Sequence, residues 1–167
     1  MKLTDVEAIL RALNDANVRY LIVDGLAVAA HGYVRATFDV DIVLNLEREN
    51  VLKAMRALTA IGYQPLVPVD PTDFADEKKR KTWREEKNMI VFQMRHSRPE
   101  STRLDIFVEE PFQFDDELAR ARWDDVGGTK SPLLHVEALI ELKKKAGRPQ
   151  DLVDVEQLEK LIKSRKK

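Results

Sequence analysis

The sequence contains no cysteine among its 167 residues. Disulfide bonds, a thiol nucleophile and thiolate zinc sites are therefore excluded, and any bound metal must be held by oxygen or imidazole ligands. No uncharged apolar run approaches the roughly 18 residues that a membrane helix needs, and residues 1–5 lack the basic and then apolar pattern of a signal peptide. We therefore expect a cytoplasmic protein without a membrane partner.

A dominant charge of one sign is also absent. The chain has 28 basic and 29 acidic residues and a net charge of -1, which differs from the strongly basic composition of many nucleic-acid-binding domains. It contains no internal repeat with a period of roughly 20 to 50 residues, which excludes solenoids and propellers. The length is that of one ordinary domain, and 44% hydrophobic with 34% charged residues predicts a packed core under a solvated surface.

The spacing of apolar residues predicts helices alternating with short strands. The predicted helices are 3–14, 26–31, 47–61, 77–87, 133–145 and 151–163. The predicted strands are 19–23, 38–44, 89–94 and 103–108. Three prolines in 63–76 predict a loop that cannot be an interior strand and is long enough to act as a lid. Ser131 and Pro132 predict the start of a helix, so the chain is expected to end as a helical hairpin. This order of elements indicates an α/β (α+β) fold with a small mixed sheet flanked by helices.

Acidic residues occupy alternate positions of the predicted strand 38–44. Asp39 and Asp41 share one face, with Cα atoms about 6.6 Å apart, which is twice the rise per strand residue. The even-numbered residues are apolar and are expected to face the core: Phe38, Val40, Ile42 and Leu44. The same alternation in strand 103–108 places Asp105 opposite an apolar face.

The three carboxylates converge if these two strands pair. Their repulsion would be relieved by a divalent cation, and a site with oxygen ligands alone favours Mg²⁺ or Mn²⁺. The alternative is that the acids face water or form ion pairs with Arg35, Arg95 or Arg103.

A glycine turn precedes the acidic strand. Strand 19–23 ends at Asp24 and Gly25, and glycine allows a phosphate to approach the backbone N–H groups at a helix start without a clash with Cβ. Arg35 and Thr37 follow, and both could contact phosphate oxygens; for Arg35 the alternative is an ion pair with Asp39 or Asp41. A turn that holds phosphates beside a metal site predicts phosphoryl transfer.

This pattern resembles the nucleotidyltransferase superfamily typified by DNA polymerase β. Gly25, Asp39, Asp41 and Asp105 match its glycine turn and its three acidic residues, whereas Asp24 stands where the superfamily has a further glycine. Segments 21–27, 31–37 and 139–152 are most similar to small bacterial AbiE-type toxin nucleotidyltransferases and their uncharacterised relatives.

The resemblance implies a role for each of these residues. Asp39 and Asp41 would bind Mg²⁺ or Mn²⁺, and Asp105 would be the third ligand and candidate base. The expected nucleotide-binding residues are Asp24, Gly25, Leu26, Arg35, Thr37, Lys144 and Arg148. For Lys144 and Arg148 the alternative is a favourable interaction with the helix dipole. The chain would form one nucleotidyltransferase-like domain, with residues 1–110 as the core with the metal site and 111–167 as a C-terminal helical extension.

The implied activity is metal-dependent transfer of a nucleoside monophosphate from an NTP to a hydroxyl of RNA, such as a tRNA end, or of a protein. The chain could then be a component of a toxin–antitoxin pair, with a cognate antitoxin or toxin as partner. One alternative is a catalytically silent nucleotide-binding or interaction module of such a pair, in which Asp24 marks lost chemistry. Another is a small-molecule nucleotidyltransferase of the antibiotic-modifying type.

Overall fold

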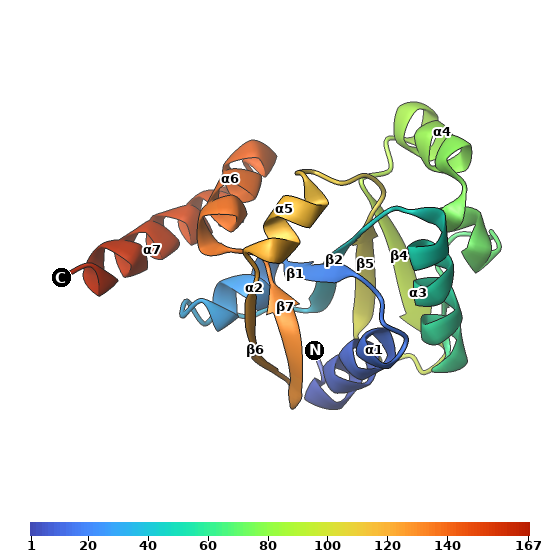
Figure 1. Cartoon of the computed structure of the whole chain (residues 1–167), viewed down its shortest axis with the longest axis horizontal. Helices are drawn as coiled ribbons and strands as arrows, with labels where there is room; N and C mark the ends of the chain where they lie inside the picture. The colour runs from blue at the N-terminus through green and yellow to red at the C-terminus, as the bar shows by residue number, and fades with distance from the viewer.

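A seven-stranded mixed sheet forms the centre of the protein, which a computed structural model describes over all residues 1–167. The strands are β1 (Tyr20–Val23), β2 (Asp39–Leu44), β3 (Tyr63–Pro65), β4 (Val91–His96), β5 (Arg103–Phe107), β6 (Arg122–Val126) and β7 (Thr129–Leu133). Their order is β3-β4-β5-β2-β1-β7-β6 (Figure 1). β2 pairs with β5 and β1 with β7 in parallel, and the other pairs are antiparallel. The predicted α/β fold with a mixed sheet is confirmed.

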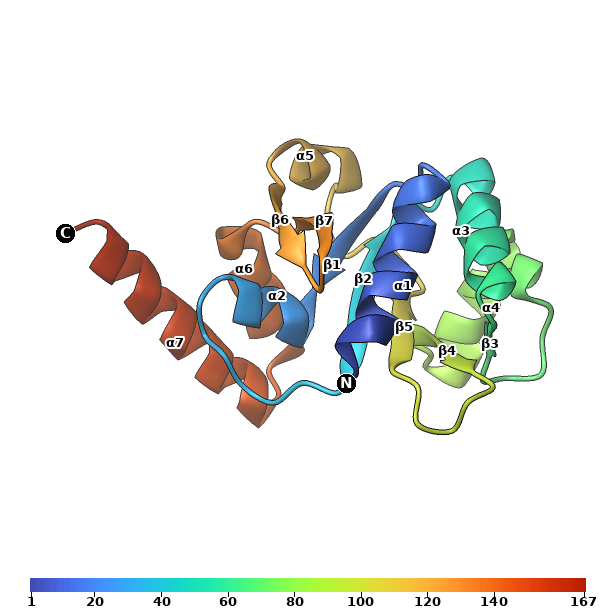
Figure 2. The same cartoon turned by 90° about the horizontal axis from the view of Figure 1, so that it is seen from below.

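Helices flank this sheet. They are α1 (Leu3–Asp15), α2 (Asp24–Ala30), α3 (Arg48–Ala60), α4 (Glu77–Lys87), α5 (Phe114–Ala119), α6 (Val136–Ala146) and α7 (Pro149–Arg165), with a 3-10 helix, η1, at Pro71–Ala75. α1 packs beside α3, and α2 packs beside α6 (Figures 1 and 2). α6 and α7 form the predicted hairpin, and α7 projects at the end of the molecule opposite α3 and α4. None of the helices combines the length and the apolar character needed to cross a lipid bilayer.

The long helices form where the apolar spacing predicts them. In α1 the side chains of Val6, Ile9, Leu10 and Leu13 recur at helical intervals, and all four are fully buried. α4 begins at a side-chain cap, because Asp76 accepts hydrogen bonds from the first backbone N–H groups of the helix.

The segment 63–76 is more ordered than the predicted loop. β3 pairs only with β4 at the sheet edge, which agrees with the exclusion of an interior strand by the prolines. Phe74 in η1 is fully buried, and its ring stacks on Phe92 with the two centroids 4.8 Å apart. A segment anchored in the core in this way is not a free lid, and that expectation is wrong.

The predicted helix start at Ser131 is also wrong. Ser131 and Leu133 are fully buried in β7, which forms an antiparallel hairpin with β6, and the helix begins only at Val136. Pro132 fits this strand because β6 is at the sheet edge and β7 pairs with β1 only at its end. Residues 111–167 therefore contribute two strands and α5 to the fold as well as the helical hairpin.

Candidate active site

Asp41 and Asp105 lie side by side on the sheet face opposite the apolar core. The two acidic strands do pair, which was the condition for their acids to converge, and the parallel register of β2 and β5 aligns Asp41 with Asp105 and Asp39 with Arg103. The apolar residues that alternate with them are fully buried: Val40, Ile42, Leu44, Leu104 and Ile106. Phe38, which was expected to face the core with them, is 73% exposed because β2 begins only at Asp39. Asp105 is only 7% exposed, so its carboxylate lies largely away from water.

The electrostatics of these acids favour a compensating cation. Burial, followed by the negative charges of Asp24, Asp105 and Asp39, raises the pKa of Asp41 to about 8. Burial also raises the pKa of Asp105, although the Arg103 guanidinium opposes this. The Oδ1 atom of Asp105 is buried without a hydrogen-bond partner. A carboxylate oxygen in this situation loses its hydration and makes no hydrogen bond in return, which is unfavourable unless a ligand completes the site.

The donor set fits a hard divalent cation, because all ligands would be carboxylate oxygens. Arg103 provides part of the compensation already: its Nη2 donates to Asp39 at 2.7 Å, and its Nε lies 3.5 Å from Asp105. The alternative expectation, that an arginine pairs with one of the acids, is therefore confirmed for Asp39 and Arg103. Asp41 has no ion pair with any arginine or lysine. Metal binding by Asp39 would require the Arg103 side chain, which is 42% exposed, to move away.

The glycine turn between β1 and α2 is closely covered by two of the predicted phosphate-binding residues. A Cβ atom at Gly25 would lie 2.3 Å from Oγ1 of Thr37 and 3.3 Å from Nη1 of Arg35, so only glycine fits here. Leu26 is buried in the core, which leaves only its backbone for a ligand. Asp24 starts α2 with φ +55°, in the left-handed region that few residues other than glycine adopt.

Asp24 belongs to a cluster of alternating charges, which we call the Lys143 cluster. It comprises Asp24, Arg35, Lys143, Arg148, Asp151 and Asp154. The ammonium of Lys143 donates to Asp24 at 2.6 Å and to Asp151 at 2.9 Å, and it lies 2.8 Å from Asp154. Its three N–H donors are thus matched by three carboxylates.

Two arginines complete the cluster. Arg35 forms a bidentate pair with Asp154, with distances of 2.8 and 2.7 Å. Arg148 pairs with Asp151 at 2.7 Å and reaches Asp24 at 3.1 Å. Arg35 therefore contacts neither Asp39 nor Asp41, and both predicted pairings are wrong, because the α7 carboxylate of Asp154 is nearer.

The Lys143 cluster contains the one group of three carboxylates whose oxygens lie within 4.8 Å of one another: Asp24, Asp151 and Asp154. These oxygens could surround a metal, but the Lys143 ammonium already contacts all three. The three carboxylates are balanced by Lys143, Arg35 and Arg148, so this group does not need a further cation. The acids with less compensation are Asp41, which has no ion pair, and Asp105, whose ion pair with Arg103 is long, at 3.5 Å.

The pKa shifts agree with this assignment. Burial alone would lower the pKa of Lys143, but the hydrogen bonds that its ammonium donates to Asp154, Asp24 and Asp151 raise it above its usual value. Burial would likewise raise the pKa of Asp154, and the bonds from Arg35 and Lys143 lower it instead. Lys143 and Asp154 are therefore both charged at neutral pH, in contrast to Asp41 with its pKa of about 8.

Lys144, the predicted nucleotide-binding lysine, points elsewhere. Its ammonium lies 3.1 Å from Glu159 on α7 and 3.9 Å from Glu141, and it does not line the pocket described below. The neighbouring Lys143 takes the place in the site that was expected for Lys144. The helical period could have indicated this, because Lys143 continues the buried stripe of Leu139 and Ile140, whereas Lys144 lies on the outer face. Asp151 and Asp154 were also missed, although Asp151 follows Arg148 at the spacing of a helix cap.

A pocket of about 410 Å³ joins the two groups of acids. Asp41 and Asp105 line one part of it, and Asp24, Lys143 and Arg148 line another. Its apolar wall is formed by Ile90, Val91, Phe107, Leu142 and Ala146. Its volume is in the range of pockets that hold small organic ligands.

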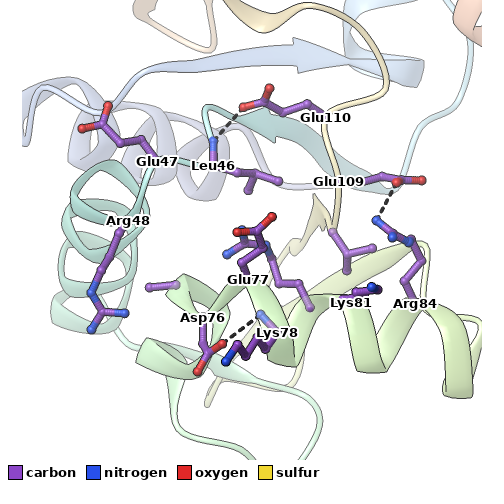
Figure 3. A pocket seen from close by; sticks show the side chains of 13 residues that line it. Leu46, Glu47, Arg48, Asp76, Glu77, Lys78, Lys81, Arg84, Glu109 and Glu110 are labelled. Atoms are coloured by element: carbon purple, nitrogen blue, oxygen red, sulfur yellow. Dashed lines mark hydrogen bonds and ion pairs between the residues drawn. The ribbon is translucent and has the colours of Figure 1, made fainter.

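The largest pocket of the protein, about 840 Å³, is a different one, between α3, α4 and the residues after β5 (Figure 3). Five basic and five acidic side chains line it, and several of them bind each other or the backbone. Glu109 pairs with Arg84 at 2.8 Å, and Glu110 accepts from the backbone N–H of Leu46 (Figure 3). This pocket contains neither Asp41 and Asp105 nor any residue of the Lys143 cluster, so we place the candidate active site in the smaller pocket.

Comparisons with known proteins identify relatives in structure but not in sequence. No family model matches the chain, and no curated protein matches it either. Three solved structures resemble nearly all of it. The lincosamide antibiotic adenylyltransferase LnuA, solved with lincomycin bound, has a TM-score of 0.62 at 18% identity, covering 95% of this chain and 96% of that one.

Two further structures extend this likeness. ANT(2'')-Ia, in complex with adenylyl-2''-tobramycin, has a TM-score of 0.60 at 15% identity, covering 93% of this chain and 86% of that one. An antigenic nucleotidyltransferase-like protein from Paracoccidioides brasiliensis has a TM-score of 0.57 at 18% identity, covering 96% of this chain and 75% of that one. These identities are too low to carry over an activity. They show that the chain has the fold of nucleotidyltransferases.

Proposed function

We propose that this protein transfers a nucleoside monophosphate from an NTP to a hydroxyl group and releases pyrophosphate. The observation that carries the proposal is the alignment of Asp41 with Asp105 on β2 and β5, where both acids line one pocket with Lys143 and Arg148. Carboxylates suit a divalent cation, and basic side chains suit phosphate oxygens. The fold shared with adenylyltransferases supports the same conclusion.

Each residue has a distinct task in this proposal. Asp39, Asp41 and Asp105 would hold Mg²⁺ or Mn²⁺, which neutralises charge that develops on the phosphates. Asp105 accepts the proton of the acceptor hydroxyl, whose oxygen forms a bond to the α-phosphorus while the bond from that phosphorus to the bridging oxygen of pyrophosphate breaks. The raised pKa of Asp105 suits this role as a base. Thr37 and the backbone at Gly25 position the phosphates.

The acceptor that the pocket fits best is a small molecule with an apolar face. Phe107, Leu142 and Ile90 form an apolar wall beside Asp105, where the acceptor hydroxyl must lie. The pocket has no run of basic residues that would follow an RNA backbone. The relatives in structure include proteins with a lincosamide or an adenylylated tobramycin bound, which supports the same class of acceptor.

A label-transfer experiment tests the activity. The protein is incubated with each α-labelled NTP, Mg²⁺ or Mn²⁺, and separate acceptors: a panel of amino-sugar and lincosamide compounds, total RNA, and cell protein. We expect label on a small-molecule acceptor, lost by at least about a hundredfold in Asp41→Ala and Asp105→Ala. Glu86→Ala, which removes an exposed carboxylate on α4, is the matched control and should keep full activity.

The same experiment tests the acceptors and the biological role implied by the resemblance. Label on RNA or protein alone would contradict a small-molecule acceptor and support the RNA or protein acceptor. A toxin–antitoxin role, and a particular closeness to AbiE-type toxins, stay predictions. They are tested by expressing the chain in a bacterial host with and without its neighbouring genes: growth arrest that a neighbour relieves and that Asp41→Ala abolishes is expected of a toxin.

The second candidate is a silent nucleotide-binding module. One observation favours it: the carboxylate of Asp24, whose backbone is left-handed, already accepts hydrogen bonds from Lys143 and Arg148, the basic residues of the pocket. The two candidates differ in a simple result. Nucleotide binding with no transfer to any acceptor by the unmodified protein, and transfer restored by Asp24→Gly, would support the silent module and contradict the enzyme.

A further inference from the structure

Asp24 differs from the other carboxylates of the Lys143 cluster in its position and exposure. Asp151 and Asp154 belong to α7 and are almost completely buried. Asp24 comes from the turn between β1 and α2, its side chain is 24% exposed, and it lines the pocket. Asp151 also lines the pocket, but its side chain is only 2% exposed, so Asp24 is the carboxylate of the cluster that is most accessible to a ligand there.

The contacts of Asp24 are those that a phosphate group would make. One carboxylate oxygen accepts from the Lys143 ammonium at 2.6 Å, and the other accepts from the Arg148 guanidinium at 3.1 Å. Arg35 Nη2 lies 3.8 Å away. Phosphate oxygens accept from ammonium and guanidinium groups in the same way.

The charge balance of the cluster depends on Asp24. Lys143, Arg35 and Arg148 supply three positive charges, and Asp24, Asp151 and Asp154 supply three negative ones. Without the Asp24 carboxylate the cluster carries one net positive charge, on the wall of the pocket that also contains Asp41. Lys143 and Arg148 each keep Asp151 as a partner, so they stay in place when Asp24 leaves.

The backbone at Asp24 holds this carboxylate in a conformation that is unfavourable for most residues. With φ +55° the residue lies in the left-handed region, which glycine adopts freely and aspartate adopts at a modest cost. A strained residue at the edge of a pocket is held by its contacts, here the two basic groups, and a competing ligand for those groups releases it.

From this geometry we infer that Asp24 is an internal anion that occupies a polyphosphate-binding position on Lys143 and Arg148, and that a polyphosphate ligand binds by displacing its carboxylate. The ligand class is the polyphosphate chain of a nucleotide, and this identity rests on the proposed function. Asp24 competes with the polyphosphate for the same cations and also repels it. The protein therefore binds polyphosphate with a lower apparent affinity than a variant without this carboxylate. The inference deepens the proposed function by assigning Asp24 to the regulation of ligand binding.

Tripolyphosphate is the probe that tests the inference, because it binds without any transfer reaction. Its affinity is measured by isothermal titration calorimetry, with and without Mg²⁺, for the unmodified protein, Asp24→Asn and Asp24→Gly. We expect both variants to bind about tenfold more tightly or better, in the usual range for coupling between two competing groups. Asp24→Gly also removes the backbone strain, so it guards against a folding defect of Asp24→Asn.

A matched control separates displacement from a general change of charge. Glu159→Gln removes one negative charge from the same end of the molecule, where Glu159 contacts Lys144 rather than the pocket. It should bind tripolyphosphate as the unmodified protein does. Thermal unfolding gives a second readout: tripolyphosphate should raise the midpoint of Asp24→Gly more than that of the unmodified protein, because it replaces the missing partner of Lys143.

The outcomes distinguish this inference from the proposed function. Equal affinity in the unmodified protein and both Asp24 variants, or no measurable binding in any of them, overturns the displacement of Asp24. Tighter binding by the variants without nucleotide transfer by any form supports the displacement and contradicts the enzyme. Nucleotide transfer by the unmodified protein, with no effect of Asp24→Gly on tripolyphosphate binding, supports the enzyme and contradicts the displacement.

Discussion

Single residues in the pocket differ in how their charge is compensated. Lys143 is a buried cation with three carboxylate partners, whereas Asp41 is a partly buried acid whose ionised form is disfavoured by the charges of other acids. The first arrangement holds the fold together, and the second weakens it unless a ligand binds. Binding sites often lower the stability of the folded protein in this way.

Replacement of Asp41 tests this difference. We expect Asp41→Asn to be more stable than the unmodified protein by about 1 kcal/mol at neutral pH in the absence of divalent cations. The raised pKa means that folding forces this carboxyl to take up a proton, whereas an amide does not titrate. The increase in the unfolding midpoint on addition of Mg²⁺ or Mn²⁺ should disappear at the same time. Thermal unfolding followed by circular dichroism, with EDTA or with each cation, measures both effects. A variant that is less stable and still responds to Mg²⁺ would show that Asp41 is not a ligand.

The alternation of residues along β2 and β5 was sufficient to predict which acids share a face. Asp39, Asp41 and Asp105 follow from a period of two, which is a local property. The choice between Lys143 and Lys144 required the phase of α6, and the resemblance favoured the wrong one of the two. Arg35 was predicted near the phosphates, but its partner Asp154 lies 119 positions away, and no local pattern indicates that pairing.

Among the elements, α2 and the segment between β7 and α6 are joined by one buried histidine. The Nε2 atom of His31, which is 3% exposed at the end of α2, lies 2.8 Å from the carbonyl oxygen of Leu134. Burial lowers the pKa of His31, and the charges of Arg122 and Arg165 act in the same direction. The neutral ring therefore belongs to the folded state.

A pH dependence of stability follows from this pKa. Because the pKa is lower in the folded than in the unfolded protein, the unfolded state binds more protons, and the stabilising contribution is present above the unfolded pKa of about 6.5. It is lost as the pH falls from there toward the folded pKa. We expect the free energy of unfolding of the unmodified protein to fall relative to that of His31→Gln between about pH 7 and pH 5.

Urea unfolding of both proteins at several pH values measures this difference. Glutamine can still donate to Leu134 but does not titrate, so the comparison removes the contribution of all other groups. A difference that is constant with pH would show that the titration of His31 is not coupled to folding.

Strong periodicity was sufficient to predict most elements, but not those of the segment 111–133. The helices α1, α3, α4 and α7 and the strands β2, β4 and β5 were predicted close to their observed bounds. β6 and β7 were missed because Pro132 and the charged residues of β6 are unusual in strands, and their pairing with each other and with β1 overrides the local preference. The burial of Ser131 is a consequence of that pairing.

At the scale of the whole molecule, the Lys143 cluster connects the C-terminal hairpin to the sheet. Asp24 is the first residue of α2, directly after β1, Lys143 is on α6, and Asp151 and Asp154 are on α7. Because the hairpin lies at one end of the molecule, with α7 projecting from it, these ion pairs are an important part of its attachment (Figures 1 and 2).

Removal of the central cation should release the hairpin. Lys143→Met keeps the length of the side chain but leaves the buried carboxylates without their shared partner, and we expect a loss of about 3–5 kcal/mol. Hydrogen exchange should then show faster exchange in α6 and α7 than in α1. Lys144→Met, which removes an exposed cation of the same helix, should cost about 0–1 kcal/mol. Similar exchange in α7 for the two variants would contradict the role of Lys143.

The sequence by itself determined the class of fold, the periodicity of most elements and the face that carries Asp39, Asp41 and Asp105. These are local properties, because side-chain alternation and helical spacing depend on neighbours in the chain. Only the tertiary structure decided the strand order, the placement of Lys143 and the pairing of Asp24 with cations 119 and 124 positions away. Such contacts depend on how α6 and α7 pack beside α2, and packing selects among many arrangements that the same local pattern allows.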